Sequence, residues 1–311
     1  MSGPAEPTGL DVEIVDTINR LYGRHPHARA LHAKGLFCEG TFRASAEAGA
    51  LCRAPHLQGS EVPVTIRFST AGGDPGVHDG EREGRGMAVR FRPGGGEVSD
   101  LLCVTSPTFL VGTPEDFLEL LRARMPDPET GAPDMEKVGA FLGAHPEAMP
   151  AVQANLGTEP PSSFARLAYN SLHAFRLLDA AGAGRWVRYR WEPELGEERI
   201  GDEEAKSRGP DHLRADLQAR VAAGEAAFSL VLVLGEDSDP TDNPAAPWPE
   251  DRERVVAGRL EVTSLIADPE SDGSIVVFDP TNVCDGIELP DDPILFARSR
   301  AYSVSAERRA G

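Results

Sequence analysis

One histidine and one arginine–tyrosine pair, far apart in the chain, have the side-chain types that acid–base or metal chemistry needs. His32 follows a basic turn and comes shortly before an apolar stretch that begins at Leu36. Because imidazole titrates near neutrality, His32 could be an acid–base group or a ligand. A single histidine beside apolar residues is also typical of a hydrogen-bonded core or edge position. The assignment therefore depends on partners elsewhere in the chain.

The second set is Arg298 and Tyr302, which are four residues apart in a segment with helical spacing. Residues at this spacing lie on one face of a helix. A guanidinium next to a phenol favours the phenolate form, and a tyrosinate is a hard anionic ligand that can hold haem iron. The same spacing is typical of an ordinary surface pair, so the two residues alone leave both interpretations open.

Composition restricts the classes of partner. The 311 residues include 40% hydrophobic and 26% charged residues, as in a soluble globular protein. The 50 acidic and 31 basic residues give a net charge of -19, which argues against nucleic acid or an anionic membrane as partner. Neither a signal peptide nor a membrane-spanning run is evident, so we expect a cytoplasmic protein. Four scattered cysteines predict buried thiols in a reducing compartment: Cys38, Cys52, Cys103 and Cys284.

The elements that must position these residues alternate between helix and strand patterns. Helical spacing and cap signals predict helices over 10–22, after a cap at Thr113, and over 134–144, 213–221 and 293–309. Short apolar runs predict strands at 62–69, 87–91, 185–191, 226–234, 260–266 and 275–278, within a strand-rich region from 36 to about 110. Residues 192–206 are expected to be an acidic, solvated loop.

This order of elements lacks a regular strand–helix–strand rhythm. It predicts an α+β fold in which an antiparallel sheet of about eight strands closes into a barrel, with helices packed around it. Such a barrel can hold a ligand in or beside it. We expect a single domain over residues 1–311, with a flexible segment at 1–8. His25 and His27 lie close to His32 and could hold a metal, but they lack the usual zinc spacing and a supporting Cys or carboxylate motif.

Six short segments occur in the order and rough spacing of the haem catalase family. They are Arg29–Gly35 around His32, Arg67–Thr70, Arg85–Phe91, the Ser-Pro-Thr-Phe-Leu run from Ser106, Phe278–Asn282, and Arg298 with Tyr302. The chain resembles this family from about residue 15 to residue 309. It looks closest to the short catalase-related peroxidases, because it is too short for the long amino-terminal arm and extra carboxy-terminal helices of typical catalases.

The resemblance assigns roles on both sides of a b-type haem. Tyr302 would be the proximal iron ligand and Arg298 its charge partner. His32 would be the distal acid–base group, and Ser69 would hydrogen-bond to it and hold its orientation. The haem would be the expected cofactor, and no NADPH site is expected.

Further residues are assigned to the cofactor by the same resemblance. Arg29, Arg67 and Arg309 match positions that pair with the haem propionates, for which a planar guanidinium is well suited. Phe109 and Phe117 match aromatic positions on the distal side, where an apolar wall excludes water. Simple core packing is the alternative for the two phenylalanines.

One position departs from the family pattern. Catalases carry an asparagine that helps to place hydrogen peroxide over the iron, and an ungapped alignment puts Val104 at this position, with Thr105 beside it. Valine cannot donate or accept a hydrogen bond, whereas Thr105 could substitute in part if it faces the haem. Thr105 is therefore included among the candidate catalytic residues.

The resemblance and this departure together predict a haem peroxidase that reduces organic hydroperoxides with an external electron donor and has little catalase activity. The alternatives are a true catalase, an enzyme that rearranges hydroperoxides to allene oxides, and a non-enzymatic barrel that carries haem or another ligand. The expected partners are a small peroxide and an electron donor, without nucleic acid or membrane. The resemblance suggests a homo-oligomer, and a dimer or a monomer is as compatible with the sequence as a tetramer.

Overall fold

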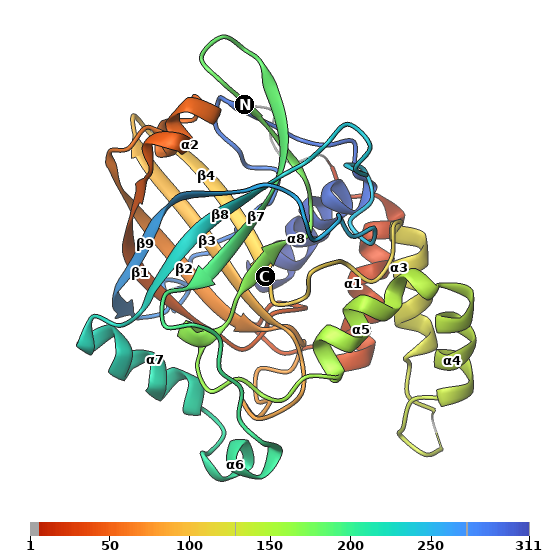
Figure 1. Cartoon of the computed structure of the whole chain (residues 1–311). Coiled ribbons are helices and arrows are strands. Elements are labelled where there is room, and N and C mark those ends of the chain that lie inside the picture. Colours follow the sequence, from red (N-terminus) through yellow and green to blue (C-terminus); the bar gives the residue numbers. More distant parts are fainter. Residues whose placement is uncertain (1–5, 128, 272, 311) are drawn as a thin grey trace.

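The fold is built around a closed antiparallel barrel (Figure 1). The computed structural model describes residues 6–127, 129–271 and 273–310. In this part of the chain the hydrogen-bonded ring runs β1-β2-β3-β4-β5-β7-β8-β9, and β9 pairs with β1 to close it. The bounds are β1 Gly35–Ala44, β2 Glu61–Thr70, β3 Arg85–Gly94, β4 Glu97–Val104, β5 Tyr169–Ser171, β7 Gly184–Pro193, β8 Ala227–Leu234 and β9 Arg254–Ile266.

Two short strands extend the sheet beyond the ring. β6 (Phe175–Leu178) pairs with the start of β7, and β10 (Ile287–Glu288) pairs with β6. β5 pairs with β7 further along the same edge, at Tyr169 and Asn170. The predicted α+β fold with an antiparallel barrel of about eight strands is confirmed.

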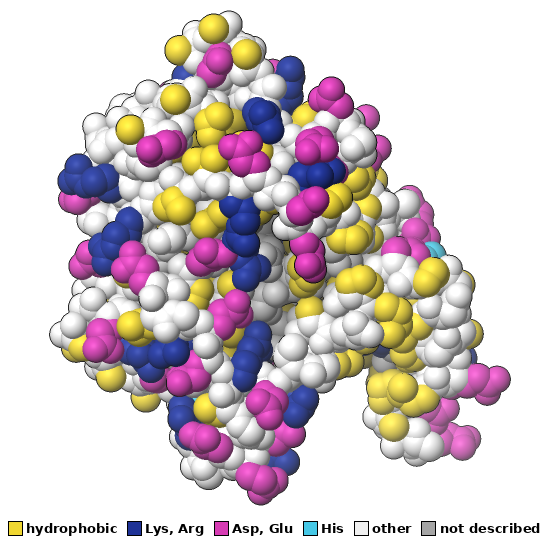
Figure 2. All heavy atoms as spheres, viewed as in Figure 1, with side chains coloured by type: hydrophobic (Ala, Val, Ile, Leu, Met, Phe, Trp, Pro, Cys, Tyr) yellow, Lys and Arg dark blue, Asp and Glu magenta, His cyan; other side chains and the backbone are white. Residues whose placement is uncertain are grey.

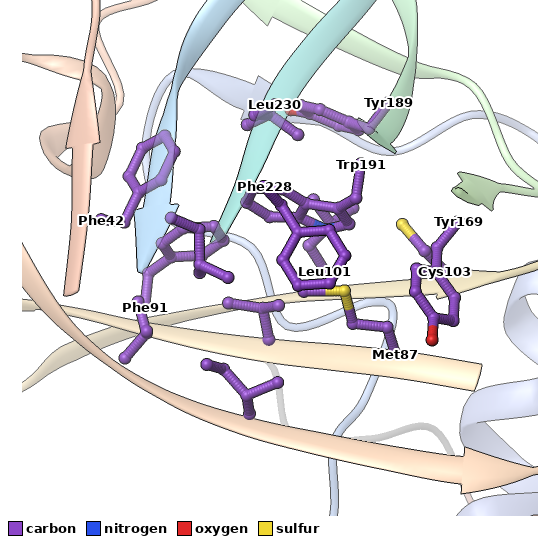
Figure 3. Close-up of a cluster of buried hydrophobic side chains, with 14 of the residues drawn as sticks. Phe42, Met87, Phe91, Leu101, Cys103, Tyr169, Tyr189, Trp191, Phe228 and Leu230 are labelled. Atoms are coloured by element: carbon purple, nitrogen blue, oxygen red, sulfur yellow. The ribbon is translucent and has the colours of Figure 1, made fainter. Parts of the chain in front are cut away.

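The inside of the barrel is filled with side chains. Alternate residues of the strands point inward because successive side chains of a strand lie on opposite faces. Figure 3 shows this cluster, in which Phe91 and Trp191 stack with ring centroids 6.5 Å apart and Phe42 meets Trp191 edge-on. A filled interior leaves no room for a ligand there, so a bound group must lie beside the barrel.

Helices pack outside the barrel, and most of them gather on one side of it. Figure 1 shows α1, α3, α4, α5 and α8 together to the right of most of the strands, whereas α7 and α6 lie below the strands and α2 lies at the upper left of the barrel. The bounds are α1 Gly9–Tyr22, α2 Ala46–Leu51, α3 Pro114–Ala123, α4 Met135–Ala144, α5 Met149–Leu156, α6 Asp202–Ser207, α7 His212–Ala223 and α8 Pro293–Ala310. Three short 3-10 turns cover Pro55–Leu57, Pro146–Ala148 and Phe164–Arg166.

Local sequence explains where the helices of this side begin. Thr8 forms a capping box with Asp11 at the start of α1, and Thr113 caps α3. Asp134 caps α4 with hydrogen bonds to two backbone N–H groups. The apolar faces of α1 and α3 then pack together through Ile14, Ile18, Leu118 and Leu121.

Two local predictions were wrong. Residues 275–278 form no strand, because the carbonyls of Val276 and Val277 accept hydrogen bonds from the side chains of Arg29 and Arg90. The segment 192–206 is not only a loop, since it contains the end of β7 and most of α6.

The expected flexible segment at 1–8 falls largely on residues 1–5, which lie outside the described residues. Within the described residues, no helix is both long enough and apolar enough to cross a membrane.

Candidate active site

A cavity of about 600 Å³ lies beside the barrel, between the strands β2, β3 and β4 and the helices α1, α3 and α8. His32 and Tyr302, which are widely separated in the chain, both line it. The cavity reaches the surface at α4 and α5, where the lining residues Met135 and Leu156 are 70% and 60% exposed. Figure 2 shows hydrophobic side chains gathered over α4 and α5, at the lower right.

His32 is held from several sides. Its Nδ1 lies 2.9 Å from the Ser69 hydroxyl, its backbone N–H donates to Ala71, and its carbonyl accepts a hydrogen bond from Arg67. Its φ of 55° lies in the left-handed region, which costs about 1–2 kcal/mol for most residues. The neighbouring Ala30 N–H donates to Ser305 on α8. These contacts fix the ring beside the cavity and leave Nε2 for proton exchange.

Gly86 gives the imidazole its space. It lies opposite Ser69 in the β2–β3 register. A Cβ at this position would be 2.9 Å from His32 Cε1, from His32 Nδ1 and from the Ser69 hydroxyl oxygen. Position 86 therefore requires glycine, because any side chain there would collide with the His32 ring.

The Gly86→Ala variant is expected to remain folded but to react with peroxide at least about tenfold more slowly, because a small misplacement of His32, the expected acid–base group, is costly. Stopped-flow measurement of the reaction with peroxide checks this. Gly94→Ala is no suitable control, since its φ is 106°; Gly139→Ala is, because a Cβ there meets no atom within 4 Å. An unchanged rate in Gly86→Ala would contradict the steric argument.

The electrostatic surroundings keep His32 neutral. Burial, together with the positive charges of Arg67, Arg298 and Arg29, lowers the pKa of His32 to about 3. A neutral imidazole can accept a proton, which a base in peroxide cleavage must do.

We expect the rate of peroxide reaction to show no ionisation of His32 between about pH 5 and pH 8. As the pH falls below the ordinary pKa of 6.5, unfolded His32 binds a proton that the folded protein does not, because burial lowers the folded-state pKa to about 3. His32 therefore reduces the stability of the fold through this window without limiting the rate. Rate profiles and urea unfolding at each pH check both parts. A rate loss centred near pH 6.5 in folded protein would contradict the first part.

Tyr302 and Arg298 meet as their spacing predicts. The Arg298 Nε and Nη2 atoms lie 3.1 Å and 2.9 Å from the Tyr302 hydroxyl oxygen. The third nitrogen, Nη1, lies 2.8 Å from His173 Nε2, and His173 Nδ1 lies 2.6 Å from Asp292. Asp292, His173, Arg298 and Tyr302 therefore form one hydrogen-bonded chain that ends at the phenol.

Sequence reasoning missed His173 and Asp292. Burial is the main cause that lowers the pKa of His173 to about 4, although Asp292 opposes it. A neutral His173 that donates from Nδ1 to Asp292 can accept from Arg298 at Nε2. Asp292 was detectable only as the cap of α8, where it accepts from the backbone N–H groups of Ile294 and Leu295. Its partner is 119 residues away.

Arg29, Arg67 and Arg309 converge on the cavity from three segments. Burial, followed by the charge of Arg29, holds the pKa of Arg67 well below its ordinary value. Buried Nε atoms of Arg67 and Arg309 have no hydrogen-bond partner. Buried donors of this kind are usually satisfied, so the cluster has the donors and the charge to accept the carboxylates of a haem. The residues present fit the group.

Phe109 and Phe117 lie side by side on the cavity wall, with ring centroids 5.2 Å apart. They pack against the cluster of Val111, Leu120 and Phe141. The structure therefore places both at the apolar wall, where their packing and their expected role are compatible.

The structure contradicts the assignment of Thr105 as a candidate catalytic residue. Its hydroxyl accepts a hydrogen bond from the Arg85 backbone N–H, 3.0 Å away, and it does not line the cavity. Val104, at the end of β4, lines the cavity in its place, as do Ser106 and Thr108. β4 pairs with β3 up to Val104, and Thr105 extends this pairing, because its backbone N–H donates to the Arg85 carbonyl while its hydroxyl accepts from the Arg85 N–H.

The suggested metal site at His25, His27 and His32 is not supported. His25 Nε2 lies 2.9 Å from the Tyr22 carbonyl, where it closes the end of α1, and the His32 ring faces Ser69. Among the described residues, the one group with suitable spacing is Asp116, Glu119 and His145. Exposed acidic groups of this kind are common without an ion.

A closed antiparallel barrel with a cavity beside it, lined by His32, Tyr302 and three arginines, is the arrangement expected of the haem catalase family. The family model for catalases matches residues 3–311, and the chain belongs to the catalase family. This confirms the resemblance found in the sequence. Family membership implies a haem cofactor and an oxidoreductase that acts on peroxide.

Two relatives are similar over nearly their whole length. The chain is 38% identical to a catalase-related peroxidase of Mycolicibacterium paratuberculosis, covering 100% of this chain and 97% of the relative. It is 33% identical to a catalase-related peroxidase of Synechococcus elongatus, covering 96% of this chain and 88% of the relative. The chain is therefore a catalase-family peroxidase.

Solved catalase structures share the fold. A fungal catalase superimposes with a TM-score of 0.79 at 21% identity, covering 92% of this chain and 60% of that structure. Catalase A from Saccharomyces cerevisiae gives a TM-score of 0.80 at 20% identity, covering 91% of this chain and 61% of that structure. The chain spans about three fifths of the length of these structures.

Proposed function

We propose that the protein is a b-type haem peroxidase that reduces organic hydroperoxides to alcohols with an external electron donor, and that it has little catalase activity. The single observation that carries the choice of substrate is Val104 on the cavity wall, with the Thr105 hydroxyl turned away. An apolar side chain here offers no hydrogen bond to a second peroxide oxygen, whereas it can pack against the alkyl group of an organic hydroperoxide.

The shape of the cavity supports the same choice. Its volume of about 600 Å³ lies within the usual range for small-molecule and cofactor sites. Apolar residues of α3, α4 and α5 line the path to the surface, among them Phe117, Leu142 and Val152. Such a path accepts an apolar substituent without leaving polar groups unpaired.

The chain's own residues would divide the work. Tyr302 would bind the iron, and the Arg298 guanidinium holds its phenol oxygen in place with two hydrogen bonds. Arg29, Arg67 and Arg309 would bind the propionates. Bound haem supplies the redox chemistry for cleavage of the O–O bond. His32, oriented by Ser69, takes the hydroperoxide proton at Nε2 and returns it to the departing oxygen.

Val104→Asn tests this proposal, because the amide supplies the missing hydrogen-bonding group. We expect wild-type protein to convert cumene hydroperoxide to its alcohol in the presence of a donor dye and to evolve little oxygen from hydrogen peroxide. Val104→Asn should evolve oxygen at least about tenfold faster, an increase of about 1.4 kcal/mol in transition-state stabilisation. An oxygen electrode and product analysis by mass spectrometry measure both.

Thr105→Val is the matched control, since it removes a hydroxyl that does not face the cavity. Its oxygen evolution should equal that of the wild type. Rapid oxygen evolution by the wild-type protein would instead identify a true catalase. Conversion of a lipid hydroperoxide to an allene oxide, without donor consumption, would identify a rearranging enzyme.

The proposal includes a cytoplasmic location. The four cysteines are buried and free, which supports a reducing compartment.

A further inference from the structure

Glu270 lies between two of the arginines that face the cavity. Its Oε2 lies 2.8 Å from Arg29 Nη1, and its Oε1 lies 2.6 Å from Arg309 Nη1. The Glu270 side chain is only 10% exposed. The catalase resemblance assigned no role to this residue, and the sequence pattern did not single it out.

The carboxylate is held in place by the backbone as well. Val276 N–H donates to Glu270 Oε1 over 2.8 Å, and the Val276 carbonyl accepts from Arg29 Nη2 over 2.9 Å. Glu270 therefore joins Arg29, which precedes β1, to Arg309 at the end of α8. Its position is set by two charged partners and one backbone donor.

The charges around Glu270 are mostly positive. Arg29 and Arg309 both lower the pKa of Arg67, after burial, whereas Glu270 and Asp268 raise it. Burial also lowers the pKa of Arg29, and Glu270 opposes this shift while Arg309 adds to it. Three like charges in a partly desolvated cluster repel one another. One nearby carboxylate reduces that repulsion before any cofactor is bound.

We propose that Glu270 is a built-in counterion of the cofactor site, which stabilises the cofactor-free protein and weakens the binding of the cofactor's carboxylates. Both effects have the same physical origin. Without cofactor, Glu270 offsets repulsion among the arginines. With cofactor, it repels the propionates that bind the same cluster. This inference rests on the proposed haem site, because it concerns the arginines assigned to the propionates.

Glu270→Gln removes the charge and keeps the side-chain size. We expect its cofactor-free form to melt about 3–6 °C lower than that of the wild type. Its haemin complex should lose haemin at least about threefold more slowly. Full-length protein, prepared with and without haemin, is followed by thermal unfolding and by the Soret band during transfer of haemin to excess apomyoglobin.

Glu288→Gln is the matched control, since it removes an equal charge from an exposed pair with Arg176. It should leave haemin release unchanged. Asp268→Asn provides a second variant if cofactor-free Glu270→Gln does not fold, because exposed Asp268 acts on Arg29 and Arg67 through charge. Asp268→Asn should also lower the melting temperature of the cofactor-free form and slow the loss of haemin, but by less than Glu270→Gln does.

Unchanged melting of cofactor-free Glu270→Gln, or faster release of haemin from it, would overturn the inference. Failure of the proposed haem site is distinguishable. In that case the wild-type protein itself would show no Soret band with haemin, whatever the behaviour of Glu270→Gln.

Discussion

The His32→Asn variant is expected to consume organic hydroperoxide about 10²–10⁴-fold more slowly than the wild type, while it still binds haem. This is the usual contribution of general acid–base catalysis. His32 is the ring that the structure holds neutral, with Nδ1 at Ser69 and Nε2 left for proton exchange. Asparagine is preferred to alanine because it tolerates the φ of 55° at this position.

Stopped-flow mixing with cumene hydroperoxide measures the rate, and the Soret band measures the haem. His27→Asn is the matched control, because His27 is exposed and has a φ of 62°. Within the described residues, these two are the only non-glycine residues with positive φ. His27→Asn should keep the wild-type rate. Full activity of His32→Asn would refute the acid–base role.

The second large effect is expected for Tyr302→Phe. Loss of the phenol oxygen removes the proposed iron ligand and two of the hydrogen bonds that Arg298 donates. Groups that only support a metal ligand contribute about 10–100-fold to affinity, so loss of the ligand itself should cost at least that much in haem affinity. The bands that arise from tyrosinate-to-iron charge transfer should disappear.

Haemin titration and the visible spectrum of any bound haem test this. Tyr22→Phe is the control, because Tyr22 also lines the cavity and its hydroxyl accepts a hydrogen bond only from Arg124 among the described residues. It should bind haem as the wild type does. An unchanged spectrum in Tyr302→Phe would show that another residue binds the iron.

The hydrogen bonds that link Asp292, His173, Arg298 and Tyr302 explain how the fold supports such a ligand. Asp292 and His173 are almost fully buried, and each link accepts or donates in a fixed direction. Buried polar networks that are fully satisfied fix side-chain geometry. The phenol oxygen is therefore positioned by Arg298 on the same helix, α8, and by His173, which lies between β5 and β6 and holds Arg298.

Local sequence patterns predicted the helix caps and the arginine–tyrosine pair correctly. Thr113 and Asp134 cap their helices, and Arg298 contacts Tyr302 one turn away. Each of these depends on residues within four positions. The wrong strand at 275–278 has the opposite origin, because its carbonyls found arginine donors from distant segments.

By itself, the sequence determined the type of barrel, the order of the family motifs and the residues able to perform acid–base and ligand chemistry. The tertiary structure decided that the barrel interior is full, that Val104 and not Thr105 faces the cavity, and that His173 and Glu270 join the site. The reason is physical. Propensity and spacing act between near neighbours, whereas these contacts form only when the closed barrel brings its outer helices and loops together.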